Sequence, residues 1–158
     1  MYTSMRDDAE GLLVAIWSGA SNVDADYDAV VEDIAASSRA GVKTGAAVVR
    51  LMFADAENPT PNAAQRQRIV GAVRSDTGPK SQFFVMITPS ILIRGVVTAI
   101  AWFAPPTHKT SAHATLDEAL AWIEERRPGV VARLREMSER VRTRAGARDR
   151  LSTPRATG

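Results

Sequence analysis

The side chains that could do chemistry are few and widely spaced. The chain has no cysteine, which excludes disulfides, thiolate metal sites and cysteine nucleophiles. Its only histidines, His108 and His113, have no carboxylate close in sequence to complete a metal site, and we interpret them as surface residues. Neither a glycine-rich phosphate loop nor a G-x-S-x-G nucleophile elbow is present. We therefore predict no catalytic residue, no metal and no cofactor, and expect a protein that is not an enzyme.

Asp55, Thr88 and Lys109 could together form a phosphate-accepting site, because Asp55 and Thr88 each end a predicted strand. Such a set resembles the site of a response-regulator receiver, in which an Asp accepts a phosphate beside Mg²⁺, and this resemblance implies an acidic pair after the first strand. Here Asp7 and Asp8 precede that strand instead. We therefore interpret Asp55 as a loop residue.

Thr60 and Arg50 each have a functional and a structural interpretation. Thr60 stands before Pro61 at the expected start of a helix, where free N–H groups would stabilise a phosphate on its hydroxyl. An N-cap followed by proline at the first helical position already explains the same pair fully. Arg50 interrupts an apolar strand and could reach a ligand at the sheet edge, although such side chains more often extend into solvent.

Apolar runs predict strands and one-sided apolar spacing predicts helices, and the two alternate along the chain. The predicted strands cover residues 2–6, 11–18, 44–53, 82–88 and 108–114. The predicted helices cover residues 22–40, 61–76 and 91–103, with two more that begin at Thr115 and Val130. Gly41 is expected to end the first helix, and Thr115 with Glu118 forms a capping box. This order predicts an α/β fold with a mainly parallel sheet of four or five strands covered by helices.

The predicted helix 91–103 is apolar apart from Arg94 and Thr98. Arg94 and Thr98 are equally consistent with the exposed edge of a core helix and with a groove that faces a partner. Because the helix has more apolar surface than one side of a sheet needs, Ile91, Arg94 and Thr98 are candidates for partner binding. Leu134 and Met137 lie on a second apolar stripe and are candidates for the same reason. The apolar stretch 83–103 has the length of a membrane span. Because 88–90 and 94–95 interrupt it, we predict no span.

Charge divides the chain unevenly. Residues 126–158 hold ten arginines against three acids, a net charge of +7, and the rest of the chain carries −5. We predict an α/β domain over 1–127 and a basic C-terminal helix and tail over 128–158, disordered from Thr143 onward. The tail could contact nucleic acid through counterion release, but it has no interleaved aromatic residues, and we interpret it as solvated. The first residues have no secretory signal, which with the missing cysteine predicts a cytoplasmic location.

The order of these features resembles the STAS domain, in its SpoIIAA-like branch. The resemblance covers about residues 1–127 and is carried by Trp-Ser-Gly at 17–19, by Pro-Ser at 89–90 with Arg-Gly at 94–95, and by Thr-Leu-Asp-Glu-Ala-Leu-Ala-Trp at 115–122. It implies partner binding, to kinase-like anti-sigma factors or neighbouring domains and sometimes to nucleotides or lipids. It also implies a phosphorylated Ser or Thr at the start of the second main helix. The family's Asp-Ser-Ser-Gly signature is absent, which leaves Thr60 as the only hydroxyl there.

We therefore predict a non-enzymatic protein-interaction module in a bacterial-type regulatory or scaffold assembly, which binds a protein partner or a second copy of itself. The alternative is a carrier of a small molecule, a lipid or a nucleotide, in a SEC14-like pocket beneath the helix at 91–103.

Overall fold

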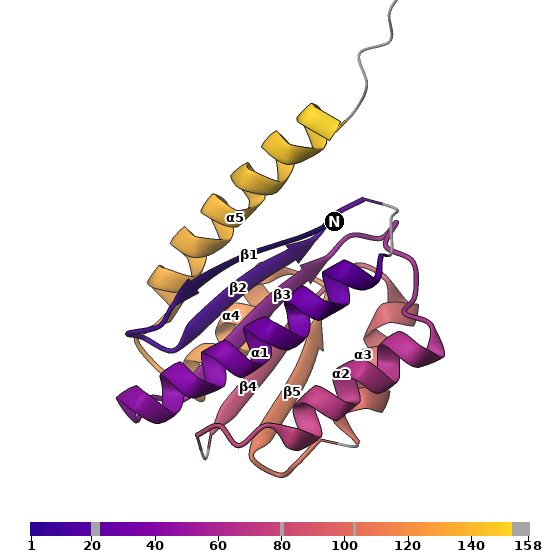
Figure 1. Cartoon of the computed structure of the whole chain (residues 1–158). Coiled ribbons are helices and arrows are strands. Elements are labelled where there is room, and N and C mark those ends of the chain that lie inside the picture. Colours follow the sequence, from indigo (N-terminus) through magenta and orange to yellow (C-terminus); the bar gives the residue numbers. More distant parts are fainter. Residues whose placement is uncertain (20–22, 80, 103, 153–158) are drawn as a thin grey trace, which may run out of the picture.

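The computed structural model describes residues 1–19, 23–79, 81–102 and 104–152, the last five without their side chains. The elements in chain order are β1 Tyr2–Asp7, β2 Leu12–Trp17, α1 Asp24–Thr44, β3 Val48–Ala54, α2 Ala63–Ser75, β4 Gln82–Ile87, α3 Ile91–Ala101, β5 His108–His113, α4 Leu116–Glu124 and α5 Val131–Ser152. The five strands form one sheet in the order β1-β2-β3-β4-β5 (Figure 1). β1 and β2 form an antiparallel hairpin, and the other pairs are parallel. The predicted α/β fold with a mainly parallel sheet is confirmed.

Helices cover both faces of this sheet, which explains why every residue of β2 and β3 is buried. On one face α4 and α5 pack over a core that includes Val14, Leu51 and Val85. On the other face lie α1, α2 and α3, and the neighbouring strand residues Ala15, Met52 and Met86 point toward them. Consecutive residues of each strand therefore contribute to different cores.

The C-terminal helix belongs to the first of these cores. Leu134, Met137 and Val141 are 0% exposed and Ala145 is 2% exposed, because α5 lies across β1 and β2 with its apolar stripe against the sheet (Figure 1). Leu134 and Met137, predicted to contact a partner, instead complete the fold of their own chain. The stripe extends to Ala145, so the helix continues to Ser152 where disorder was predicted from Thr143.

Among the helix boundaries that differ from the predicted ones, the end of α1 and the start of α2 have a clear physical reason. Gly41 lies inside α1, which continues to a left-handed C-cap at Gly45, with φ of 71°. A Cβ at Gly41 would come within 2.5 Å of Val48 Cγ2, so this glycine allows α1 to approach the sheet closely. α2 begins after Asn62, whose side chain forms a capping box with Gln65, and not at the predicted Thr60-Pro61.

Truncation of Met137 tests this role of α5. The Met137→Ala variant is expected to lose about 2–5 kcal/mol of unfolding free energy, because it leaves a cavity between α5 and the sheet. Urea denaturation followed by circular dichroism measures the loss. Exposed Thr143→Ala on the same helix is the control and is expected to change stability by less than about 0.5 kcal/mol. Equal stability of M137A and wild type would contradict the packing described.

Candidate functional site

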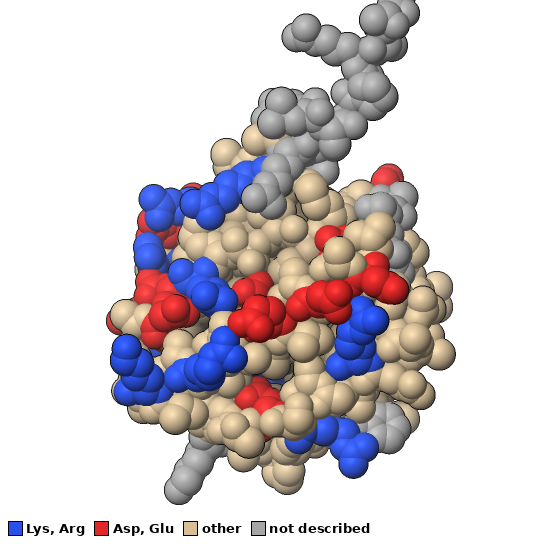
Figure 2. All heavy atoms as spheres, in the orientation of Figure 1, with Lys and Arg blue, Asp and Glu red and all other residues tan. Residues whose placement is uncertain are grey.

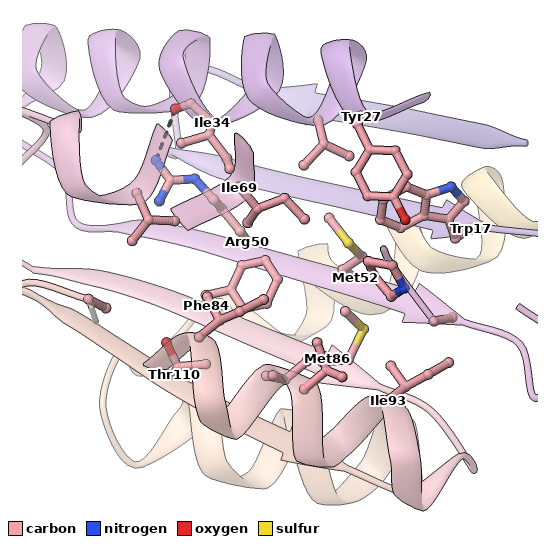
Figure 3. Close-up of a pocket in the computed structure, with 18 of the residues that line it drawn as sticks. Trp17, Tyr27, Ile34, Arg50, Met52, Ile69, Phe84, Met86, Ile93 and Thr110 are labelled. Carbon is pink, nitrogen blue, oxygen red and sulfur yellow. Dashed lines mark hydrogen bonds between the residues drawn. The ribbon is translucent and has the colours of Figure 1, made fainter. Parts of the chain in front are cut away.

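A cavity of about 80 Å³ lies between the sheet and the helices α1, α2 and α3 (Figure 3). It extends along the length of β3, from Arg50 near the start of the strand to Ala54 at its end. Nearly all of its wall is apolar. The residues that line it are Trp17, Tyr27, Val30, Ile34, Arg50, Met52, Ala54, Asn58, Pro59, Pro61, Ile69, Val73, Phe84, Met86, Ile93, Val96, Val97, Ile100, Ala104, His108 and Thr110.

The cavity exists because the two helices above it pack against different elements. α2 packs on α1, and α3 packs on β5, so neither helix fills the space over β3 and β4. Ile69 and Val73 of α2 are therefore only half-buried. Phe84 is also half-buried, although it lies in the middle of β4 with a strand on either side, and its ring faces the cavity (Figure 3).

Helix α3 is apolar on both its inner and its outer side. Ser90 caps it by accepting a hydrogen bond from the Ile93 N–H at 3.3 Å. Ile93 and Val97 are buried and line the cavity. Ile91, Leu92 and Trp102 point outward and are 76%, 74% and 79% exposed. An outer side of this kind has no structural role within the described part of the chain.

The predicted partner residues of α3 lie in three different settings. Ile91 belongs to the exposed outer side. Arg94 is half-buried and its Nη1 donates hydrogen bonds to the Thr88 carbonyl at 2.8 Å and the Pro89 carbonyl at 3.2 Å, which holds the strand-to-helix turn. Thr98 is exposed, and its hydroxyl donates to the Arg94 carbonyl of the preceding turn at 3.0 Å.

A buried polar cluster closes the cavity at the end where the parallel strands begin. The structure places Arg50 in neither of the two predicted settings. Its side chain is 2% exposed, so it reaches neither solvent nor an edge of the sheet. Its Nε donates to Ser37 Oγ at 2.8 Å and its Nη1 to Gln82 Oε1 at 2.7 Å. Its Nη2 contacts the Ile34 carbonyl at 3.0 Å, Ser38 Oγ and Asp76 Oδ2 at 3.2 Å. Every nitrogen of this guanidinium therefore has an acceptor within the protein.

Asp76 supplies the counter-charge of this cluster. Burial by itself raises the pKa of the Asp76 carboxyl, but hydrogen bonds from His108 and Ser38 and the charge of Arg50 lower it to about 2. His108 Nε2 lies 3.2 Å from Asp76 Oδ2, and both side chains are 3% exposed. The prediction of a surface residue is therefore wrong for His108, because β5 begins beside the end of α2.

The remaining predicted site residues do not gather in one place. Thr60 is exposed in the loop before α2, and Asp55 is exposed at the end of β3. His113 lies on the other face of β5, where its Nε2 is 2.7 Å from Ser111 Oγ and its ring is 6.3 Å from that of Trp122. Burial and the nearby Arg126 lower the pKa of His113. No group of three or more His, Asp or Glu side chains suited to a metal ion occurs within the described residues.

Sequence reasoning missed Asp76, Ser37, Ser38 and Gln82, which complete the Arg50 cluster. Only Arg50 itself gave a signal, because a charge inside an apolar strand needs a buried partner. Asn58 was also missed. Its Nδ2 donates to the Gly19 carbonyl at 2.8 Å, while its buried Oδ1 has no hydrogen-bond partner among the described residues.

The comparisons with known proteins add no relative. No protein-family model matches the sequence, and neither a curated protein nor a solved structure matches the chain. The α/β fold with its five-stranded mixed sheet is what the structure itself establishes. Across the described ranges, every helix is too short or too polar to cross a membrane.

Replacement of Asp76 tests the buried cluster through its pH dependence. Because the folded-state pKa lies below the ordinary value of 3.8, the carboxylate stabilises the fold above about pH 4, and this contribution disappears as the pH falls to about 2. Asp76→Asn is therefore expected to lower stability by about 2 kcal/mol at neutral pH. It should also flatten the loss of stability between those two pH values.

Thermal unfolding at a series of pH values measures both effects. Asp117→Asn is the matched control, since that carboxylate is 81% exposed and pairs with Arg135 on the surface. An acid limb of D76N that follows the wild-type curve would show that the Asp76 charge contributes nothing to the fold.

Proposed function

We propose that this chain is a non-enzymatic binding module of the STAS-like type that takes an apolar small molecule into the cavity beneath α2 and α3. The observation that carries the proposal is the cavity itself. On their cavity side, the apolar side chains of Met52, Phe84 and Met86 lack packing partners over the middle of the sheet. Exposing apolar surface to a void forfeits packing energy, so a ligand that fills the void stabilises the fold.

The chemistry of the wall favours a hydrocarbon over a nucleotide. A nucleotide site needs free N–H groups or cations for its phosphates. Arg50 is the only arginine or lysine among the lining residues. Each nitrogen of its guanidinium already donates to Ser37, Gln82 or other groups of the protein. Thr110 and Asn58 add single polar groups at different places on the wall, enough to orient one hydroxyl or carbonyl of a ligand.

The size of the cavity limits what enters without movement. Pockets for drug-sized ligands commonly measure about 300–1,000 Å³, whereas this one measures about 80 Å³. It therefore holds a short hydrocarbon segment or a small ring as it stands. A longer ligand requires α3 to move outward, and only Ile93 and Val97 of this helix are fully buried.

A second candidate function follows from the outer side of α3. Exposed Ile91, Leu92 and Trp102 favour an interaction module whose α3 contacts a further molecule. The resemblance to STAS domains supports the same reading, with a protein partner in a regulatory or scaffold assembly. The two candidates are compatible because they use opposite sides of one helix.

Native mass spectrometry of the full chain, purified without detergent or organic solvent, tests the ligand proposal directly. The expected result is a population above the 17.0 kDa chain mass by one small molecule, released into an apolar extract of the same sample. A bare chain that also fails to bind an added apolar fluorophore such as N-phenylnaphthylamine would refute the proposal.

A cavity-filling substitution links such binding to this cavity. Ala54→Leu places three more carbons in the void at the end of β3, and it is expected to raise stability by about 1 kcal/mol and to abolish binding of the fluorophore. Ala121→Leu on the exposed side of α4 is the matched control and should leave binding unchanged. Fluorescence titration and thermal unfolding measure the two effects, and equal binding by A54L would place the fluorophore elsewhere.

A further inference from the structure

We propose that the outer side of α3 docks onto the surface of an anionic lipid bilayer. This proposal rests on the proposed function in one respect, that the α3 side of the molecule is the side that binds. What it adds is the partner that this side contacts. Ile91 and Leu92 lie at one end of α3 and Trp102 at the other, and each is about three-quarters exposed. Apolar side chains with a tryptophan at the rim are the composition that inserts into the headgroup boundary of a membrane.

The charge of the surrounding elements supplies the second observation. Residues 58–115, which form α2, β4, α3 and β5, contain six Lys or Arg and a single acid. That acid is Asp76, which is buried against Arg50 and adds no negative charge to the surface. Arg66 and Arg74 of α2 are exposed, and so is Arg68, which pairs with Asp28 of α1. Helix α2, which with α3 covers the cavity, is therefore cationic, and together with the apolar outer side of α3 it complements anionic headgroups.

The acids of the α/β domain gather elsewhere. Residues 24–33 of α1 alone hold five acids, and Figure 2 shows acidic side chains in a band over this helix. Charge is thus separated by element, with α1 acidic and α2 to β5 basic. A separation of this kind orients the domain, because a negatively charged surface attracts the α3 side and repels the α1 side.

The geometry favours docking in the plane of the membrane surface. α3 has 11 residues and is therefore about 16 Å long, which is about half of a bilayer core. Its inner side lines the cavity through Ile93 and Val97. Docking of the outer side thus brings lipid hydrocarbon within one helix diameter of the apolar cavity.

The same charges disfavour a second copy of the chain as the occupant. A two-fold contact through α3 would bring two cationic sides together, and like charges across an interface weaken association. A bilayer that contains anionic lipid has the opposite charge and needs no shape complementarity to α3.

Vesicle flotation with the full chain tests the proposal, using phosphatidylcholine vesicles with and without phosphatidylglycerol. Binding is expected only with phosphatidylglycerol and should fall as sodium chloride is raised to about 0.5 M. The triple variant Ile91→Ser, Leu92→Ser, Trp102→Ser is expected to bind about tenfold more weakly. Val42→Ser, which removes an apolar side chain 59% exposed on α1, is the matched control and should bind like wild type.

Tryptophan fluorescence reports where the vesicle binds. On vesicles with brominated lipid tails, wild-type emission should be quenched, and Trp102→Phe should abolish most of that quenching. The other two tryptophans lie away from the outer side of α3, because Trp17 is 9% exposed in the cavity wall and half-buried Trp122 packs against Phe83 on the other face of the sheet. Circular dichroism of each variant confirms that it is folded.

Three outcomes would overturn the proposal. The first is flotation that survives the α3 variant but is lost when Arg148, Arg150 and Arg155 are changed to Gln, because the tail would then be the docking site. The second is no flotation together with a dimer that the α3 variant dissociates, which would assign this side to a second copy. The third is no flotation and no dimer. In each case the fluorophore titration with A54L decides the cavity ligand separately, so either idea can fail alone.

Discussion

The charge of Arg50 in the middle of a buried strand constrains everything around it. An unpaired guanidinium at this depth would cost many kcal/mol, so the fold has to deliver acceptors to it from several directions. α1 brings Ser37 and Ser38, β4 brings Gln82, and the end of α2 brings Asp76. These contacts fix the ends of α1 and α2 relative to the sheet. The cluster thus sets one end of the space that α2 and α3 leave open.

The two faces of the sheet consequently differ in kind. Under α4 and α5, Leu134 and Met137 pack with Val14, Leu51 and Val85 in an apolar core. Under α1 to α3, the polar cluster at one end of the face holds α2 against α1, while α3 follows β5 at the edge. Because α2 and α3 pack against different elements, their side chains do not fill the space over the central strands, and a cavity remains there. One face of the sheet is therefore closely packed, and the cavity lies on the other.

The order of strands and helices was predictable because each element has its own apolar periodicity and its own start or stop residues, such as the Thr115–Glu118 capping box. Local patterns also identified α3 as a helix with surplus apolar surface. The role of the helix that begins at Val131 was harder to predict, because an apolar stripe has the same spacing whether it packs on a sheet or on a partner. Only the tertiary fold shows that Leu134 packs on the sheet of its own chain. The cluster around Arg50 could not be predicted, since Ser38, Asp76 and His108 lie far apart in sequence and meet only when the sheet forms.

The position of α3 connects the cavity with the surface. On one side of the cavity α3 is the layer between the apolar wall and the outside, and it is held by two buried side chains and by the Arg94 contacts at its first turn. Its N-terminal turn is thus anchored through backbone carbonyls, while the Trp102 end carries no comparable bond among the described residues. An outward movement of α3 would therefore pivot near Arg94 and open the cavity toward the Trp102 end.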